Sequence, residues 1–183
     1  MLPAVRHSAE AGDGPAVLRW LELESAAATE FIRKEIMRPQ PRFSSYYLRL
    51  PDASVPDQEN QVAANFAGFA SLRDDHDLVH SATLLHRYAT RGVLPAVLPF
   101  IDAKLTEWPC SIQVPVLAYL LKVSPEEAAP RVEMVLKAHR RQICGPRLLT
   151  TLGFLEPSPV LERIALSQIE TGGAAAADGA HYL

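Results

Sequence analysis

The chain has 183 residues, 48% of them hydrophobic, which fits one domain with a sizeable core. Its formal net charge of −3 argues against a nucleic-acid-binding protein, which usually carries a strongly basic domain. Residues 1–10 lack the apolar stretch of a secretory signal, and the apolar run 93–101 is too short for a membrane span. Two cysteines make no disulfide framework, so we expect a reduced, cytoplasmic setting and no membrane partner.

Residues 1–38 predict an N-terminal helix pair that packs on the remainder of the chain. Pro15 follows a Gly-Asp-Gly turn and suits the first position of a helix. A second helical stretch covers about residues 26–37. It stops before Pro39, because the residue that precedes a proline disfavours helical backbone.

Residues 39–57 form a proline- and aromatic-rich loop. Four prolines in this span exclude a long helix, and its aromatic residues Phe43, Tyr46 and Tyr47 indicate a loop pinned against the helices. Proteins also bind single-stranded nucleic acid with basic and aromatic residues together. The acidic chain favours the packed loop, and peptide binding by this loop is the second hypothesis.

Residues 58–170 predict a continuous helical array. Proline opens apolar helical stretches at positions 95, 125 and 159, which lie 30 and then 34 residues apart. In residues 124–127, a serine N-cap, a proline at the first helical position and a glutamate three residues after the cap give a strong helix start. Even spacing of this size is typical of stacked helical repeats. We therefore expect an all-α fold of about nine helices and no strand, arranged as a right-handed α-α superhelix of stacked helix pairs.

From about residue 59 to residue 170, the chain resembles the HEAT-like repeats of bacterial armadillo-type α-solenoid proteins. The resemblance is carried by the spacing of the helix pairs, by Pro95, Pro125 and Pro159 at first-helix starts, and by the apolar-small pattern of residues 116–121. It implies a scaffold that binds other proteins, with enzymes as a minority outcome.

Residues 171–183 predict a flexible Ala/Gly tail with no core-facing side chains. This tail takes the place of the second helix of the last pair, and a solenoid needs a capping element at its end. Two expectations follow: the chain belongs to a longer array, or its last helix (about 159–169) leaves an apolar face open to a partner.

Two groups of residues raise the question of a metal or redox site. His76 and His80 are one helical turn apart beside several acidic residues, a spacing that suits a divalent ion, but two histidines leave such a site short of ligands. We expect instead a helix N-terminus rich in acids. Cys110 and Cys144 lie 34 residues apart; neighbouring helices are roughly 10 Å apart, beyond the reach of a disulfide, so both are expected to be packing cysteines.

The function expected from these patterns is a non-enzymatic scaffold that binds a protein or peptide, without cofactor, metal or catalytic residues. The expected contacts are Gln113, Tyr119 and Arg147 on a concave face built by second helices, together with the aromatic residues of the 39–57 loop. The alternative is a HEAT-like enzyme that is either metal-dependent or acts on nucleic acid.

Overall fold

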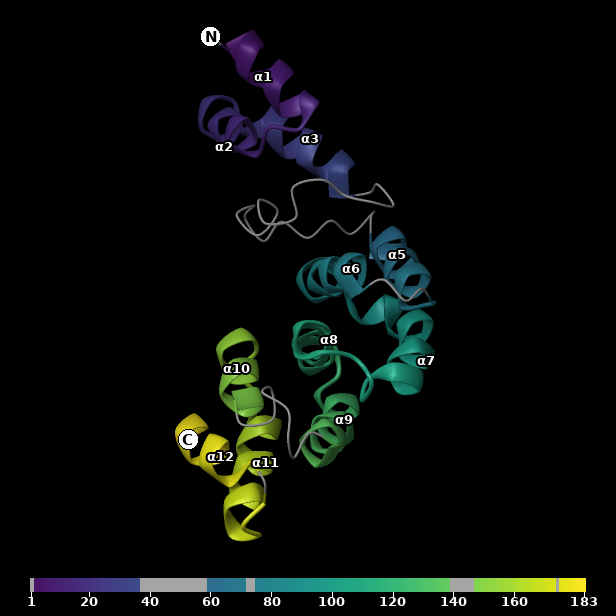
Figure 1. Ribbon diagram of the computed structural model, residues 1–183, viewed down its shortest axis with the longest axis vertical. Helices are drawn as coiled ribbons and strands as arrows, with labels where there is room; N and C mark the ends of the chain where they lie inside the picture. Colours follow the sequence, from purple (N-terminus) through teal and green to yellow (C-terminus); the bar gives the residue numbers. More distant parts are fainter. Residues whose placement is uncertain (1, 37–58, 72–74, 139–146, 174) are drawn as a thin grey trace.

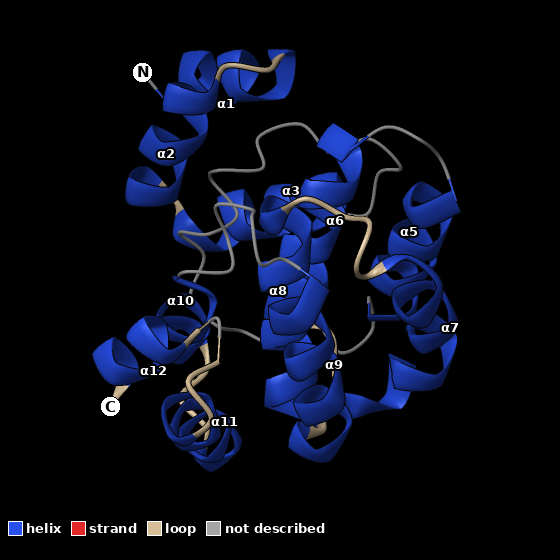
Figure 2. Cartoon of the chain, turned by 60° about the horizontal axis from the view of Figure 1, so that its bottom comes forward, coloured by secondary structure: helices blue, strands red, loops and turns tan. Residues whose placement is uncertain are grey.

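The computed structural model describes residues 2–36, 59–71, 75–138, 147–173 and 175–183. These residues form α-helices and one short 3-10 helix and contain no strand (Figure 2), which confirms the all-α class. None of the described helices is long and apolar enough to cross a membrane. The helices are α1 (Leu2–Ala11), α2 (Gly14–Leu23), α3 (Ser25–Ile36), α5 (Glu59–Ser71), α6 (Asp75–Tyr88), η2 (Arg91–Val93), α7 (Leu94–Lys104), α8 (Cys110–Val123), α9 (Pro125–Ala138), α10 (Leu148–Leu155), α11 (Pro159–Glu170) and α12 (Ala176–Tyr182).

The N-terminal region contains three helices, so the expected pair was wrong in number. Helix α1 was not predicted; it packs against α2 and contributes the buried Ala9 and the partly buried Val5 to the core. Between α2 and α3 the rings of Trp20 and Phe31 lie 5.3 Å apart. Arg6 stacks over the Trp20 ring and pairs with Glu24, so polar contacts join α1 to the end of α2.

The helices from α5 to α12 succeed one another along a curved path (Figure 1). Helix α8 packs against both α6 and α10, and we call these three helices one row. On the other side, α5 contacts α7, and α9 contacts α11. Neighbours in the chain also pack together, most extensively α5 with α6 and α11 with α12. Each helix therefore buries its apolar face against helices close to it in the sequence.

Helix α8 lies at the centre of this arrangement. Nine of its 14 residues are buried, because α6, α9 and α10 all pack against it. A helix that is apolar all round is stable only when it is covered on most sides. The consequence for binding is that α8 offers little free surface.

The proline signals mark helix starts as expected. Pro95 occupies one of the first positions of α7, and α9 and α11 begin at Pro125 and Pro159. Proline has the backbone angle that the first helical turn needs and lacks an N–H that would go unpaired there. At α11 the Ser158 hydroxyl also accepts a hydrogen bond from the Val160 N–H at 3.3 Å.

The C-terminal segment is not the flexible tail that its composition predicts. It forms α12, which packs against α10 and α11. The Asp178 side chain is only 2% exposed, and its carboxylate accepts hydrogen bonds from the Leu149 N–H (2.6 Å), the Thr150 N–H (3.1 Å) and the Thr150 hydroxyl (2.6 Å). Small residues allow this docking: a Cβ atom on Gly179 would lie 2.9 Å from the carbonyl oxygen of Ala165 in α11.

The expectation of packing cysteines is also wrong for Cys110, which is in a disulfide. Cys110 is the first residue of α8, so the distance between the axes of neighbouring helices does not set how far its sulfur lies from another residue. Cys144 lies outside the described residues. Because disulfides persist mainly in oxidising compartments, this bond counts against the reduced, cytoplasmic setting, and the compartment stays a prediction.

Candidate binding surface

Two of the predicted binding residues belong to the core. Gln113 and Tyr119 are both fully buried in α8. The Gln113 side-chain amide donates to the carbonyl oxygen of Leu105 at 2.8 Å, and the Tyr119 hydroxyl donates to the carbonyl oxygen of Thr90 at 2.9 Å. Burial, with a smaller effect of the Glu59 carboxylate, raises the pKa of the Tyr119 hydroxyl. These side chains fix α8 to the turns around α7, and the prediction that they line an exposed face is wrong.

The other predicted residues are not brought together by the described structure. Arg147 is exposed just before α10 and makes no side-chain hydrogen bond to cap that helix. Phe43, Tyr46 and Tyr47 lie outside the described residues. Of the predicted set, Arg147 is therefore the one residue on the described surface.

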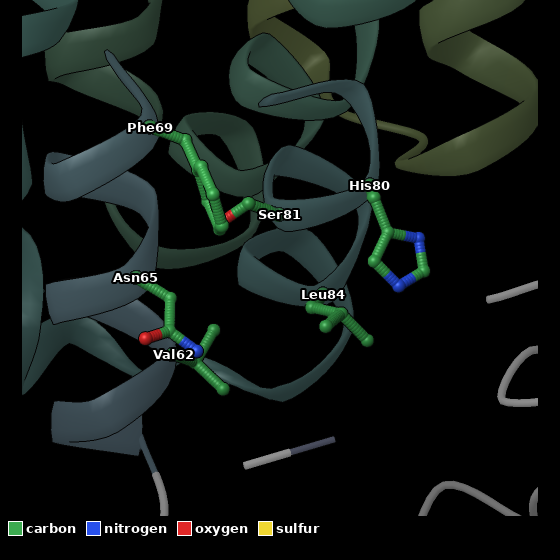
Figure 3. Close-up of a pocket in the computed structure, with 6 residues that line it drawn as sticks. All are labelled: Val62, Asn65, Phe69, His80, Ser81 and Leu84. Atoms are coloured by element: carbon green, nitrogen blue, oxygen red, sulfur yellow. The ribbon is translucent and has the colours of Figure 1, made fainter. Parts of the chain in front are cut away.

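The histidine pair considered as a metal site is not part of a ligand cluster in the described residues. Within them no group of three or more His, Cys, Asp or Glu side chains lies close enough to hold a metal ion. The side chain of His76 lies outside the described set. His80 borders a shallow recess between α5 and α6, where its ring points away from α5 (Figure 3).

This recess does not have the form of a small-molecule site. It is lined by apolar side chains and a few polar ones, and it is too shallow to enclose a water molecule. Ligand sites in proteins are usually cavities of several hundred Å³. The lining residues are Val62, Asn65, Phe69, His80, Ser81 and Leu84 (Figure 3).

A hydrogen bond between His86 and Glu156 joins α6 to the end of α10. His86 Nε2 lies 2.8 Å from Glu156 Oε1, with both side chains largely buried. Lys122 of α8 donates to the carbonyl oxygens of His86 (2.6 Å) and Arg87 (3.1 Å) at the end of α6. Burial lowers the pKa of His86, against the opposing effect of the Glu156 carboxylate. These contacts connect α6, α8 and the end of α10, so their visible role is to hold these three helices together.

Exposed apolar side chains gather at the C-terminal end of the chain. Among the described residues, six of the seven large hydrophobic side chains that are exposed lie between positions 134 and 183. Phe154, at the end of α10, is 87% exposed. This residue was not predicted, although Leu148, Leu149 and Leu152 form an apolar i, i+1, i+4 face from which it is absent. The six are Met134, Phe154, Leu155, Leu166, Ile169 and Leu183.

Comparisons of this chain with protein-family models, with curated proteins and with solved structures give no match. The arrangement of the described residues is therefore what indicates the function.

Proposed function

We propose that this protein is a non-enzymatic helical-repeat scaffold that binds another protein or a peptide. The observation that carries the proposal is the exposed apolar set on α9–α12. Burying apolar surface stabilises an assembly by about 25 cal/mol per Å². Exposed large hydrophobic side chains mark a protein-interaction site where they lie together on one surface.

The order of helix contacts supports the repeat architecture. Helices α6, α8 and α10 form one row, and first helices start at regular intervals at Pro95, Pro125 and Pro159. In stacked repeats each unit packs only on its neighbours and presents long faces to partners. The resemblance to HEAT-like repeats points to the same use.

Binding is a better account than catalysis because the buried polar side chains hold helices to one another. Asp178 caps α10, His86 pairs with Glu156, and the Gln113 amide and Tyr119 hydroxyl anchor α8. The side chains turned to solvent at the C-terminal end include the exposed large hydrophobic residues.

The proposal is tested by affinity capture with the purified full chain, followed by measurement of the recovered partner. We expect a stoichiometric protein partner whose capture is strongly reduced by Phe154→Ser and unchanged by Leu23→Ser. Leu23 is the matched control, since it is the exposed large hydrophobic of the N-terminal helices. A purified chain with stoichiometric metal and hydrolytic or hydroxylase activity, or capture that neither substitution alters, would contradict the proposal.

A further inference from the structure

Helix α11 has a second apolar stripe besides the one it buries. Leu166 is 48% exposed and Ile169 is 40% exposed, and the exposed Glu162 and Glu170 lie at either end. These positions are related by i, i+4, i+7 and i+8, so they share one face of the helix. We call them the α11 stripe.

The α11 stripe lies between the two sides by which α11 is attached to the molecule. On one side Arg163 reaches Glu126 of α9, with 3.8 Å between the charged atoms. On the other side Ala165 meets Gly179 of α12 at close range. The stripe is therefore the part of α11 that the described helices leave in solvent.

The charges on the stripe determine which kind of occupant fits. If two copies of the chain paired their α11 helices about a two-fold axis, Glu162 and Glu170 would face one another across the interface. Like charges brought together in this way oppose association. A helix with basic residues places opposite charges against both carboxylates instead.

We infer that the α11 stripe binds an amphipathic helix of a separate protein, a conclusion that rests on the scaffold function proposed above. The partner helix lays apolar side chains on Leu166 and Ile169 and carries a Lys or Arg toward each glutamate. The two glutamates are eight positions apart, which on a helix is about 12 Å. The partner's basic residues therefore lie about two turns apart. This is recognition of an amphipathic helix by its spaced anchors.

The test uses two synthetic amphipathic peptides of about 18 residues, or five helical turns. Both have leucine at the same apolar positions; one carries lysine and the other glutamate at the polar positions. Fluorescence anisotropy of each labelled peptide with the full chain should show binding of the lysine peptide alone. Replacing Leu166 and Ile169 by serine should weaken the affinity for the lysine peptide by roughly tenfold or more. The double substitution Glu162→Lys with Glu170→Lys should make the chain bind the glutamate peptide instead of the lysine peptide.

The control is Glu10→Lys with Asp13→Lys, which makes the same change of charge on exposed residues of the N-terminal helices. It should leave the affinity for the lysine peptide within roughly twofold, because these residues are far from α11 along the array (Figure 1). If the control weakens binding of the lysine peptide as much as the substitutions of Glu162 and Glu170 do, the peptide is bound by general charge attraction and the inference is overturned. A chain that dimerises in sedimentation experiments through Leu166 and Ile169 also overturns it, in favour of a second copy.

The two proposals fail in different ways. If the α11 substitutions do not change the affinity for either peptide while the Phe154-dependent partner is still captured, the inference about the α11 stripe is wrong and the scaffold function stands. If neither peptide nor protein is bound, the scaffold function fails with it.

Discussion

The carboxylate of Asp178 offers the sharpest test of the C-terminal structure. It accepts hydrogen bonds from two backbone N–H groups in the first turn of α10 and from the Thr150 hydroxyl, while it is almost fully buried. The first N–H groups of a helix have no partner within the helix. Asp178→Ala removes their acceptor and leaves them in a site that water does not readily reach.

The expected loss can be estimated from the contacts. Loss of a helix cap typically costs about 1–2 kcal/mol, and a hydrogen bond to a charged group contributes about 1.5–3 kcal/mol. The alanine variant no longer has to bury a charge, which returns part of this free energy. The free energy of unfolding should fall by about 2–4 kcal/mol. Asp178→Asn should recover less than half of it, because its amide N–H₂ would point at a donor.

The measurement is urea unfolding followed by far-ultraviolet circular dichroism. With a denaturant slope of about 2 kcal/mol per M, the midpoint should move down by about 1–2 M. Asp13→Ala is the matched control. Asp13 also precedes a helix, α2, but is exposed and makes no side-chain capping bond, so its loss should change stability by about 0.5 kcal/mol or less. Equal, small effects of both substitutions would refute the docking of α12 on α10.

Three further predictions concern packing, pH and redox state. Gly179→Ala should destabilise the chain by about 1–3 kcal/mol, because the new methyl group meets the backbone of α11. Gly68→Ala, at an exposed position within α5 where a Cβ atom meets nothing, should instead stabilise the chain by about 0.5–1 kcal/mol. Thermal unfolding of the two variants should show these opposite changes. The pKa of His86 in the folded chain lies below its ordinary value of 6.5, so His86 binds its proton more tightly in the unfolded chain. The free energy of unfolding should therefore be highest above about pH 6.5 and fall as the pH is lowered toward the folded-state pKa. His86→Gln should make this fall smaller. Thiol titration of the denatured, unreduced protein should detect no free thiol at Cys110, and reduction should release it.

Each of these predictions has a definite contrary result. Destabilisation by both glycine substitutions would show that the close approach to α11 is not the cause. An unchanged pH profile in the His86→Gln protein would assign the acid sensitivity to other groups. A reactive thiol at Cys110 before reduction would show that the disulfide is absent from the protein in solution.

Local signals in the sequence were sufficient for the helices α2 to α11 that the structure describes and for several of their starts, but not for α1 or α12. Pro125 and Pro159 mark helix starts because a proline ring sets the backbone angle of its own residue. Such features depend on residues within one or two turns of each other. They are therefore readable without knowledge of the fold.

Contacts between distant residues decided the rest. The Asp178 carboxylate caps a helix that begins about 30 positions earlier, and no pattern in the alanine- and glycine-rich segment reveals that partner. Gln113 and Tyr119 have the polar groups expected of a binding face, yet helices on several sides of α8 bury them. The sequence by itself determined most helices between residues 59 and 170, because these depend on neighbours along the chain, but it revealed neither α1 nor α12. Only the tertiary structure decided which faces stay in solvent, because burial depends on what packs from elsewhere.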